Sequence, residues 1–164
     1  MNKSCILEVP LDRQRDAVTA HVQSMRGERA VVFLCFVDTA DQWRRRLGAG
    51  DNLFFVDATG HGPPGLRFGP DVLYVDSAVK LELIAMFLER ACKRFEAPCV
   101  VLEDLAATGA ISGVEPTLEF THLLVNRYGQ RDGGIHIFLS DGPTADRMRA
   151  GLSGMSRCER LEAP

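Results

Sequence analysis

Long apolar runs and an excess of one charge are both missing from this sequence. Its 164 residues carry 19 basic and 22 acidic side chains, a formal net charge of -3 that lacks the basic excess of nucleic-acid-binding proteins. No run approaches the roughly 18 apolar residues that a membrane-spanning helix needs. The opening stretch MNKSCILEVP has too short an apolar segment for a secretory signal. We therefore expect a cytoplasmic protein without membrane association.

Paired cysteines are also missing. No two cysteines have the C-x-x-C spacing of a zinc site, and an odd count argues against a closed disulfide framework. Four of the five lie in apolar runs, where a small thiol packs well. We expect reduced core residues and no metal site at Cys5, Cys35, Cys92, Cys99 and Cys158.

Short apolar runs of strand length recur along the chain. Runs such as VVFLCFV and CVVL are apolar without alternation, which is typical of parallel strands covered by helices on both faces. The pattern predicts seven strands, at residues 4–9, 30–37, 52–57, 71–75, 98–103, 135–140 and 157–162.

Segments of helical periodicity separate these strands. They predict helices at residues 11–25, 40–47, 77–95, 116–128 and 144–152. In the first, the expected buried stripe is Leu11, Val18, Val22 and Met25. The Gly- and Pro-rich stretch 59–70 is interpreted as a surface loop. Alternating strands and helices imply a three-layer α/β fold, an open and mostly parallel sheet with helices on both faces, in a single domain over residues 1–164.

The element order resembles a known family. The segment from DVLYVDSAVK to IHIFLSD resembles the second half of a RecA-like ATPase core of the KaiC type, in which a long helix leads to an apolar strand with an acidic end. The stretch VVFLCFVDTADQWRRRL resembles the strand and helix that follow the nucleotide-binding helix of such cores. The resemblance implies a P-loop-NTPase-like fold over most of the chain.

The resemblance matches the strand end VVLED to the Walker B position. Glu103 and Asp104 thereby become the candidate catalytic acids, because Mg²⁺ prefers carboxylate oxygens and strand ends deliver them to the ligand crevice of an open α/β sheet. The alternative interpretation is that two acidic residues end a buried strand at solvent.

The phosphate-binding loop of the family is missing. Its place after the first strand is taken by EVPLDRQR, which has no glycine to let backbone amides wrap a phosphate. Pro10 removes one N–H donor, and Glu8 and Asp12 would repel phosphate. Arg13 and Arg15 are the candidate phosphate contacts, but they cannot rebuild the cradle. We expect ATP binding to be weak or absent, no Mg·ATP cofactor, and no hydrolysis.

Four further acids follow predicted strands. Asp38, Asp57, Asp76 and Asp141 should collect at one sheet edge with the Walker B match, and Asp38 and Asp57 are therefore candidate cofactor-binding residues. The alternative is helix capping, which alone explains Asp38 and Asp76.

Basic and imidazole side chains give weaker signals. The run Arg44 to Arg46 fans around a short helix and is interpreted as a solvated helix end, with a contact to phosphate, RNA or an acidic partner as the alternative. The histidines are interpreted as surface or satisfied core residues. They are His21, His61, His122 and His136.

The sequence therefore predicts a non-hydrolysing RecA/KaiC-like domain with a regulatory, signalling or protein-interaction role. We expect a protein partner, a second copy of the chain included, and no nucleic-acid partner. The alternative is an atypical Mg-dependent nucleotide-binding enzyme, an NTPase or phosphotransferase, that uses the acids at the strand ends.

Overall fold

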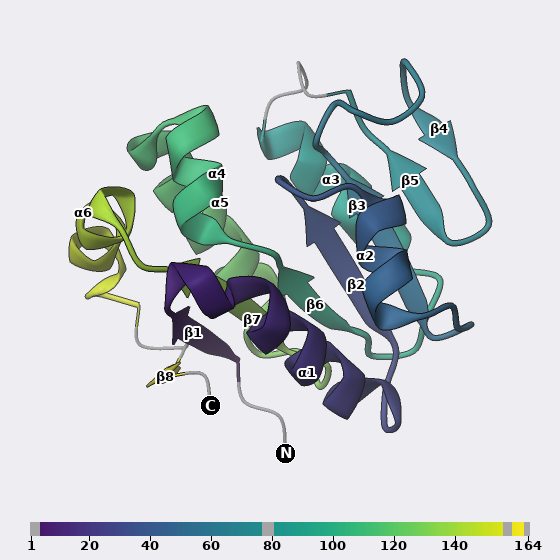
Figure 1. Ribbon diagram of the computed structural model, residues 1–164, viewed down its shortest axis with the longest axis horizontal. Coiled ribbons are helices and arrows are strands. Elements are labelled where there is room, and N and C mark those ends of the chain that lie inside the picture. The colour runs from purple at the N-terminus through teal and green to yellow at the C-terminus, as the bar shows by residue number, and fades with distance from the viewer. Residues whose placement is uncertain (1–3, 77–80, 156–158, 163–164) are drawn as a thin grey trace.

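The strands of the protein form one mixed sheet (Figure 1). The computed structural model describes residues 4–76, 81–155 and 159–162. Within these residues eight strands follow the order β4-β5-β3-β2-β6-β7-β1-β8, and every neighbouring pair is parallel except β4 with β5. The strands are β1 Cys5–Val9, β2 Val31–Cys35, β3 Leu53–Asp57, β4 Arg67–Phe68, β5 Val72–Tyr74, β6 Cys99–Leu102, β7 Ile135–Ser140 and β8 Glu159–Glu162.

Helices cover both faces of this sheet (Figure 1). Two of them, α1 and α2, pack on one face, and α3 to α6 pack on the other. The predicted three-layer, mostly parallel α/β architecture is thus confirmed. The helices are η1 Leu11–Arg13 (a 3-10 turn), α1 Gln14–Arg26, α2 Ala40–Leu47, α3 Leu81–Cys92, α4 Leu105–Ser112, α5 Val114–Tyr128 and α6 Pro143–Leu152.

Strand β2 illustrates why the apolar runs become central parallel strands. All five of its residues are buried, and successive side chains enter opposite layers of the core. Phe33 packs on Trp43 of α2 with ring centroids 5.0 Å apart, while Leu34 joins the core under α3 to α6. A strand with one solvent-facing side would have required alternating polar residues.

Two elements were not predicted. Strand β4 lies inside the expected loop 59–70, where it pairs antiparallel with β5 at the sheet edge. Helix α4 follows β6 directly, although its sequence LAATGAIS has no apolar stripe to reveal it. Gly109 within α4 allows close packing, because a Cβ there would lie 2.4 Å from the terminal methyl of Met148.

The first helix differs from its predicted pattern. Leu11 belongs to the 3-10 turn and is 67% exposed, so it is not part of the buried stripe. Gln14 takes that place beside Val18, Val22 and Met25. The helix starts only after Arg13, and this shift determines which side chains reach the site described below.

The other predictions fare as follows. Helix α3 is described over Leu81–Cys92, and residues 77–80 of the predicted helix lie outside the described residues, as does Cys158. The other four cysteines are buried free thiols, as predicted. No helix in the described ranges is long and apolar enough to cross a membrane.

Candidate functional site

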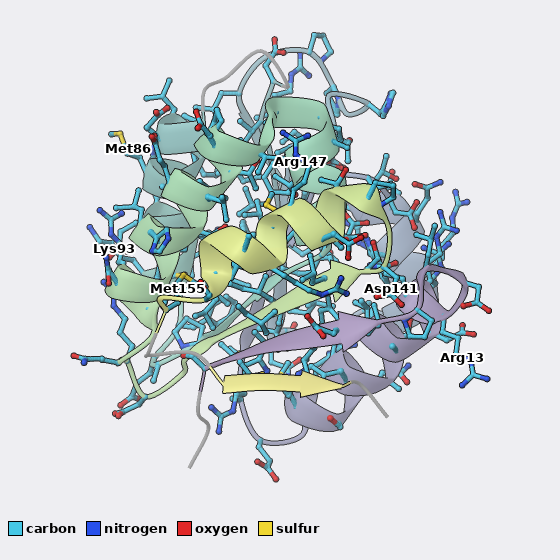
Figure 2. All side chains as sticks on the ribbon, turned by 90° about the vertical axis from the view of Figure 1, so that its left-hand side faces the viewer. Arg13, Met86, Lys93, Asp141, Arg147 and Met155 are labelled. Carbon is cyan, nitrogen blue, oxygen red and sulfur yellow. The ribbon has the colours of Figure 1, made fainter. Side chains whose placement is uncertain are left out.

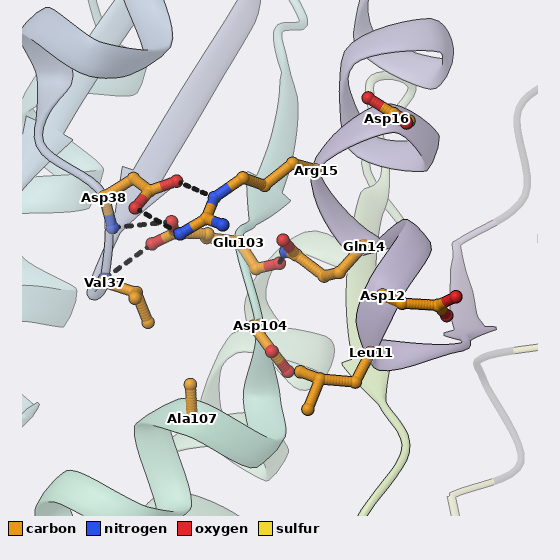
Figure 3. Close-up of a pocket in the computed structure, with 10 residues that line it drawn as sticks. All are labelled: Leu11, Asp12, Gln14, Arg15, Asp16, Val37, Asp38, Glu103, Asp104 and Ala107. Carbon is orange, nitrogen blue, oxygen red and sulfur yellow. Dashed lines mark hydrogen bonds and ion pairs between the residues drawn. The ribbon is translucent and has the colours of Figure 1, made fainter.

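A pocket of about 310 Å³ opens at the carboxyl ends of β1, β2 and β6 (Figure 3). It occupies the edge of the parallel sheet where open α/β folds place their ligands. The turn after β1, the turn after β2 and the start of α4 contribute its walls. Its lining residues are Leu11, Asp12, Gln14, Arg15, Asp16, Val37, Asp38, Glu103, Asp104 and Ala107.

Glu103 is enclosed by the turn after β2. Its Oε2 accepts hydrogen bonds from the backbone N–H groups of Phe36 at 2.6 Å and Val37 at 2.8 Å. Its Oε1 accepts from the N–H of Asp38 at 2.9 Å and from the indole N–H of Trp43 at 2.8 Å. Successive amides that converge in this way form a concave anion-binding nest. The protein's own carboxylate fills that nest.

The same enclosure changes the acidity of Glu103. The side chain is 1% exposed, and this burial raises its pKa to about 7. The N–H donors favour the ionised form and oppose the shift. Glu103 is therefore a carboxyl group that titrates near neutral pH although its oxygens face only N–H donors.

Asp104 fixes the neighbouring strand end. Its Oδ1 accepts from the N–H of Ala106 at 3.0 Å, which caps α4, and from the N–H of Ser140 at 3.1 Å. Its Oδ2 accepts from the Ser140 hydroxyl at 2.5 Å. Asp104 thus ties the ends of β6 and β7 to one helix start. The interpretation that Glu103 and Asp104 simply end a strand at solvent was wrong, because both are buried and hydrogen-bonded.

Asp38, which also lines the pocket, forms ion pairs with two arginines. Nε of Arg15 is 2.6 Å from its Oδ2, Nη2 of Arg15 is 3.1 Å from its Oδ1, and Nη1 of Arg46 is 2.9 Å from its Oδ2. The hydrogen bond from Arg15 is the main reason that the pKa of Asp38 is lowered. The capping explanation for Asp38 was wrong, because Thr39 caps α2 through a capping box with Gln42.

The turn after β1 is a tight 3-10 turn and does not form an open loop of the kind that could surround a ligand. Its 3-10 turn begins with the bond from Arg13 N to Pro10 O at 3.0 Å. Gln14 then donates its side-chain N–H to the carbonyl of Glu103 at 2.8 Å. Asp12 is exposed, and Figure 3 shows its carboxylate turned away from Glu103 and Asp38.

Not every candidate residue reaches the pocket. Arg13 projects into solvent away from it (Figure 2). Asp57 is 1% exposed and accepts from the N–H of Ala40 at 2.8 Å and the hydroxyl of Thr59 at 2.6 Å, so it supports the start of α2. Glu8 is also not part of the pocket lining, since it pairs with Arg149. Of the residues that the sequence singled out as candidates, the pocket brings together Arg15, Asp38, Glu103 and Asp104, but not Arg13 and Asp57.

Two arginines of the run Arg44 to Arg46 are bound back onto the protein. Arg44 pairs with Asp71 at 2.8 Å and with Asp41, and Arg46 pairs with Asp38. The prediction of a wholly solvated helix end was therefore wrong for Arg44 and Arg46. Arg45 remains exposed.

Sequence reasoning missed one polar pair. His21 Nε2 and His136 Nδ1 lie 2.7 Å apart, between α1 and β7. Burial lowers the pKa of His21. Because the two residues are 115 positions apart, no local spacing could have revealed this contact.

In this pocket, Asp38, Glu103 and Asp104 already accept hydrogen bonds from the protein, and the turn after β1 is a 3-10 turn. In the part of the chain that the structure describes, no group of three or more His, Cys, Asp or Glu side chains has the arrangement to hold a metal ion. Comparison of the chain with models of known protein families gives no match, and no curated protein matches it either. The interpretation of the site depends on its geometry.

Proposed function

We propose that this chain is a RecA/KaiC-like domain that does not hydrolyse nucleotide and that acts in regulation or signalling through protein contacts. The observation that carries the proposal is the position of Glu103. The acid that the resemblance matches to a Walker B residue accepts four hydrogen bonds from the protein itself. It acts as a brace between β6 and the turn after β2.

The strand arrangement supports the resemblance. Strand β7 lies between β1 and β6 in the sheet, and the carboxyl ends of β1 and β6 both border the pocket. The two positions at which the family would hold phosphate and metal are thus brought to one crevice. At the position where the family would bind phosphate, after β1, this chain has the 3-10 turn η1 in place of a glycine-rich loop with free backbone amides.

The charge of the pocket supports the loss of nucleotide binding. Its lining contains five carboxylates and a single guanidinium, that of Arg15, which is already paired with Asp38. Two of the carboxylates, Asp12 and Asp16, are exposed at the mouth. A polyanion such as ATP would meet like charge there and would find no unpaired arginine in the pocket lining.

Exposed apolar side chains at the same mouth favour a protein partner. Leu11 is 67% and Val37 is 43% exposed, and both line the pocket. Apolar side chains beside acidic groups form the kind of surface that a protein with a complementary basic residue can bury. The pocket mouth is therefore the proposed contact region.

The alternative, a Mg-dependent nucleotide enzyme, requires oxygens that can bind the metal. Both oxygens of Glu103 and of Asp104 already accept hydrogen bonds, so a metal would have to break them. Its test is phosphate release that depends on Mg²⁺ and disappears in Asp104→Asn. We expect none above the background of a Glu28→Gln control, which alters an exposed acid just beyond the end of α1, whereas the start of α1 lines the pocket.

The direct test of the proposal is thermal unfolding with saturating Mg·ATP, with ADP and GTP in parallel. A ligand at 100 times its Kd adds about 2.7 kcal/mol to the free energy of unfolding. For a chain of this size that corresponds to roughly 5 to 10 °C in Tm. We expect a Tm unchanged by each nucleotide. A rise of several degrees with any of them would refute the proposal.

A further inference from the structure

Helices α3 and α5 present an unusual outer face. Leu83 and Met86 of α3 are 43% and 61% exposed, and Leu123 of α5 is 36% exposed. Figure 2 shows Met86 and Lys93 pointing away from the protein along the outer side of α3. Large apolar side chains grouped on neighbouring helices, with charges around them, are typical of interaction surfaces.

The charges on this face follow the same order on both helices. On α3, Glu82, Met86 and Arg90 are spaced four residues apart, and on α5 Glu119, Leu123 and Arg127 have the same spacing. Residues at this spacing lie on one stripe of a helix. Each helix therefore has an acidic residue, an apolar residue and a basic residue in that order.

The two helices run in the same direction. Their amino-terminal halves meet at a small pocket of about 70 Å³, whose lining includes Glu82 and Glu119. Their carboxyl-terminal halves meet where the Tyr128 hydroxyl donates to Glu89 at 2.8 Å. The acidic residues of both stripes therefore lie together at this pocket, and the arginines lie toward the carboxyl-terminal end of each helix.

We infer that two copies of this chain associate through this α3–α5 face, related by a two-fold axis near Met86 and Leu123. A two-fold interface brings residue i of one copy to residue j of the other and residue j to residue i. With the helices of the two copies antiparallel, Glu82 and Glu119 of each copy face the arginines of the other. The apolar residues meet at the centre.

Three of the four charged groups that this contact needs are exposed. In the described ranges, neither Glu82 nor Glu119 has a side-chain hydrogen bond or ion pair to another residue. Arg90 rests over the exposed ring of Phe68 at 4.6 Å, which supports its guanidinium at the surface and leaves its edge free to donate. Arg127 is half-buried near Glu89, whose pKa it helps to lower.

The charge order selects a second copy over other occupants. An anionic partner, such as a nucleic acid or an acidic membrane, would be repelled by the glutamate end, and a uniformly basic partner by the arginine end. A second copy offers both signs in the reverse order. The pocket of about 70 Å³, floored by Leu81 and Phe120, also leaves space for an apolar side chain such as the partner's Met86.

This inference goes beyond the proposed function and does not depend on it. The α3–α5 face lies on the other side of the sheet from α1 and α2, and it shares no residue with the carboxyl-edge pocket. A nucleotide could bind the pocket while the dimer persists, or the dimer could be absent from a protein that binds none. The two claims therefore fail separately.

The test uses sedimentation equilibrium on the full chain and two charge-reversal variants. One variant carries Arg90→Glu and Arg127→Glu, which makes both ends of the face acidic. The other carries Glu82→Arg and Glu119→Arg, which makes both ends basic. We expect the wild type to dimerise, at twice 18.1 kDa, and each variant alone to have a Kd raised at least ~10-fold.

An equimolar mixture of the two variants is the decisive sample. Because an all-acidic face complements an all-basic face, the mixture should restore a dimer containing one copy of each. This result cannot arise from variants that fail to fold. Arg45→Glu, on the opposite side of the sheet, is the matched control and should leave the wild-type Kd unchanged. A monomeric wild type, a dimer that survives both reversals, or a mixture that stays monomeric would each overturn the inference.

Discussion

Trp43 on α2 donates its indole N–H to Oε1 of Glu103, 60 residues away at the end of β6, over 2.8 Å. Trp43 is fully buried and is the only tryptophan of the chain. Its fluorescence therefore reports directly on the carboxyl group that braces the candidate site. This contact makes the state of Glu103 measurable in solution.

The fluorescence of Trp43 should titrate with a midpoint near 7. Burial raises the pKa of Glu103 to about 7, and the change in charge occurs on the carboxyl group that accepts the hydrogen bond of the indole N–H. A pH titration between about 5 and 9 measures the midpoint, and the transition should be absent in Glu103→Gln. A midpoint below 5 would mean that the N–H donors outweigh the burial.

The same raised pKa fixes the direction of a stability effect. Because Glu103 binds its proton more tightly when folded than when unfolded, its contribution to stability is fully present below the unfolded pKa of about 4.3. That contribution is lost as the pH rises through about 7. The difference in the free energy of unfolding between wild type and Glu103→Gln should therefore decrease as the pH rises from about 4 to above 7. Urea denaturation at several pH values measures this difference.

Glu103→Gln should itself destabilise the protein by about 2 to 4 kcal/mol. The amide of glutamine can direct its oxygen at only one pair of donors, so its NH₂ would face the other pair. Glu28→Gln, at an exposed position, should change stability by less than about 0.5 kcal/mol. Equal values for the two variants in urea denaturation would show that Glu103 is no brace.

Asp38→Asn should cost about 1 kcal/mol at neutral pH, since solvent screens the exposed Arg15 partner. The pKa of Asp38 is lowered in the folded protein, chiefly by the hydrogen bond from Arg15. Its stabilisation is therefore present above the unfolded pKa of about 3.9 and is lost as the pH falls through the lower folded value. Urea denaturation of both proteins at several pH values should show a constant difference above about pH 5 that shrinks in acid. A difference that grows in acid would contradict the pairing.

Gly133→Ala should destabilise the protein by about 2 to 3 kcal/mol. A Cβ at this position would lie 1.9 Å from the carbonyl oxygen of Pro98 and 2.6 Å from that of Ala97, and backbone atoms cannot move aside like a side-chain tip. The matched control is Gly27→Ala at the end of α1, where a Cβ would meet nothing within 4 Å and the backbone is αR. The control should be neutral or slightly stabilising. Thermal unfolding of both variants checks the difference, and equal Tm values would refute it.

The sequence was sufficient for most of the fold because central parallel strands leave an unambiguous pattern. The fully apolar runs around Phe33 and Val101 can only be covered on both faces, and they became β2 and β6. Helix α4 was missed because its residues contact the sheet, α5 and α6, so no polar face marks its period. Strand β4 was missed because two exposed residues in a Gly-rich stretch carry no strand signal.

The candidate site could be located from the sequence, but its bonding could not. Strand ends collect at one edge in any parallel sheet, so the proximity of Asp38 and Glu103 follows from element order alone. The hydrogen-bond partners of Glu103 depend on the conformation of the turn after β2, which directs three backbone amides and the Trp43 indole at one carboxylate. Such convergence of groups 60 to 67 residues apart has no local signature.

A crystal structure determined in the presence of saturating Mg·ATP tests the central claim most directly. The account predicts Glu103 still bonded to the amides of Phe36, Val37 and Asp38, with no triphosphate density in the pocket beside the turn η1. Ordered triphosphate there, with Glu103 displaced from its amides toward a metal ion, would contradict it.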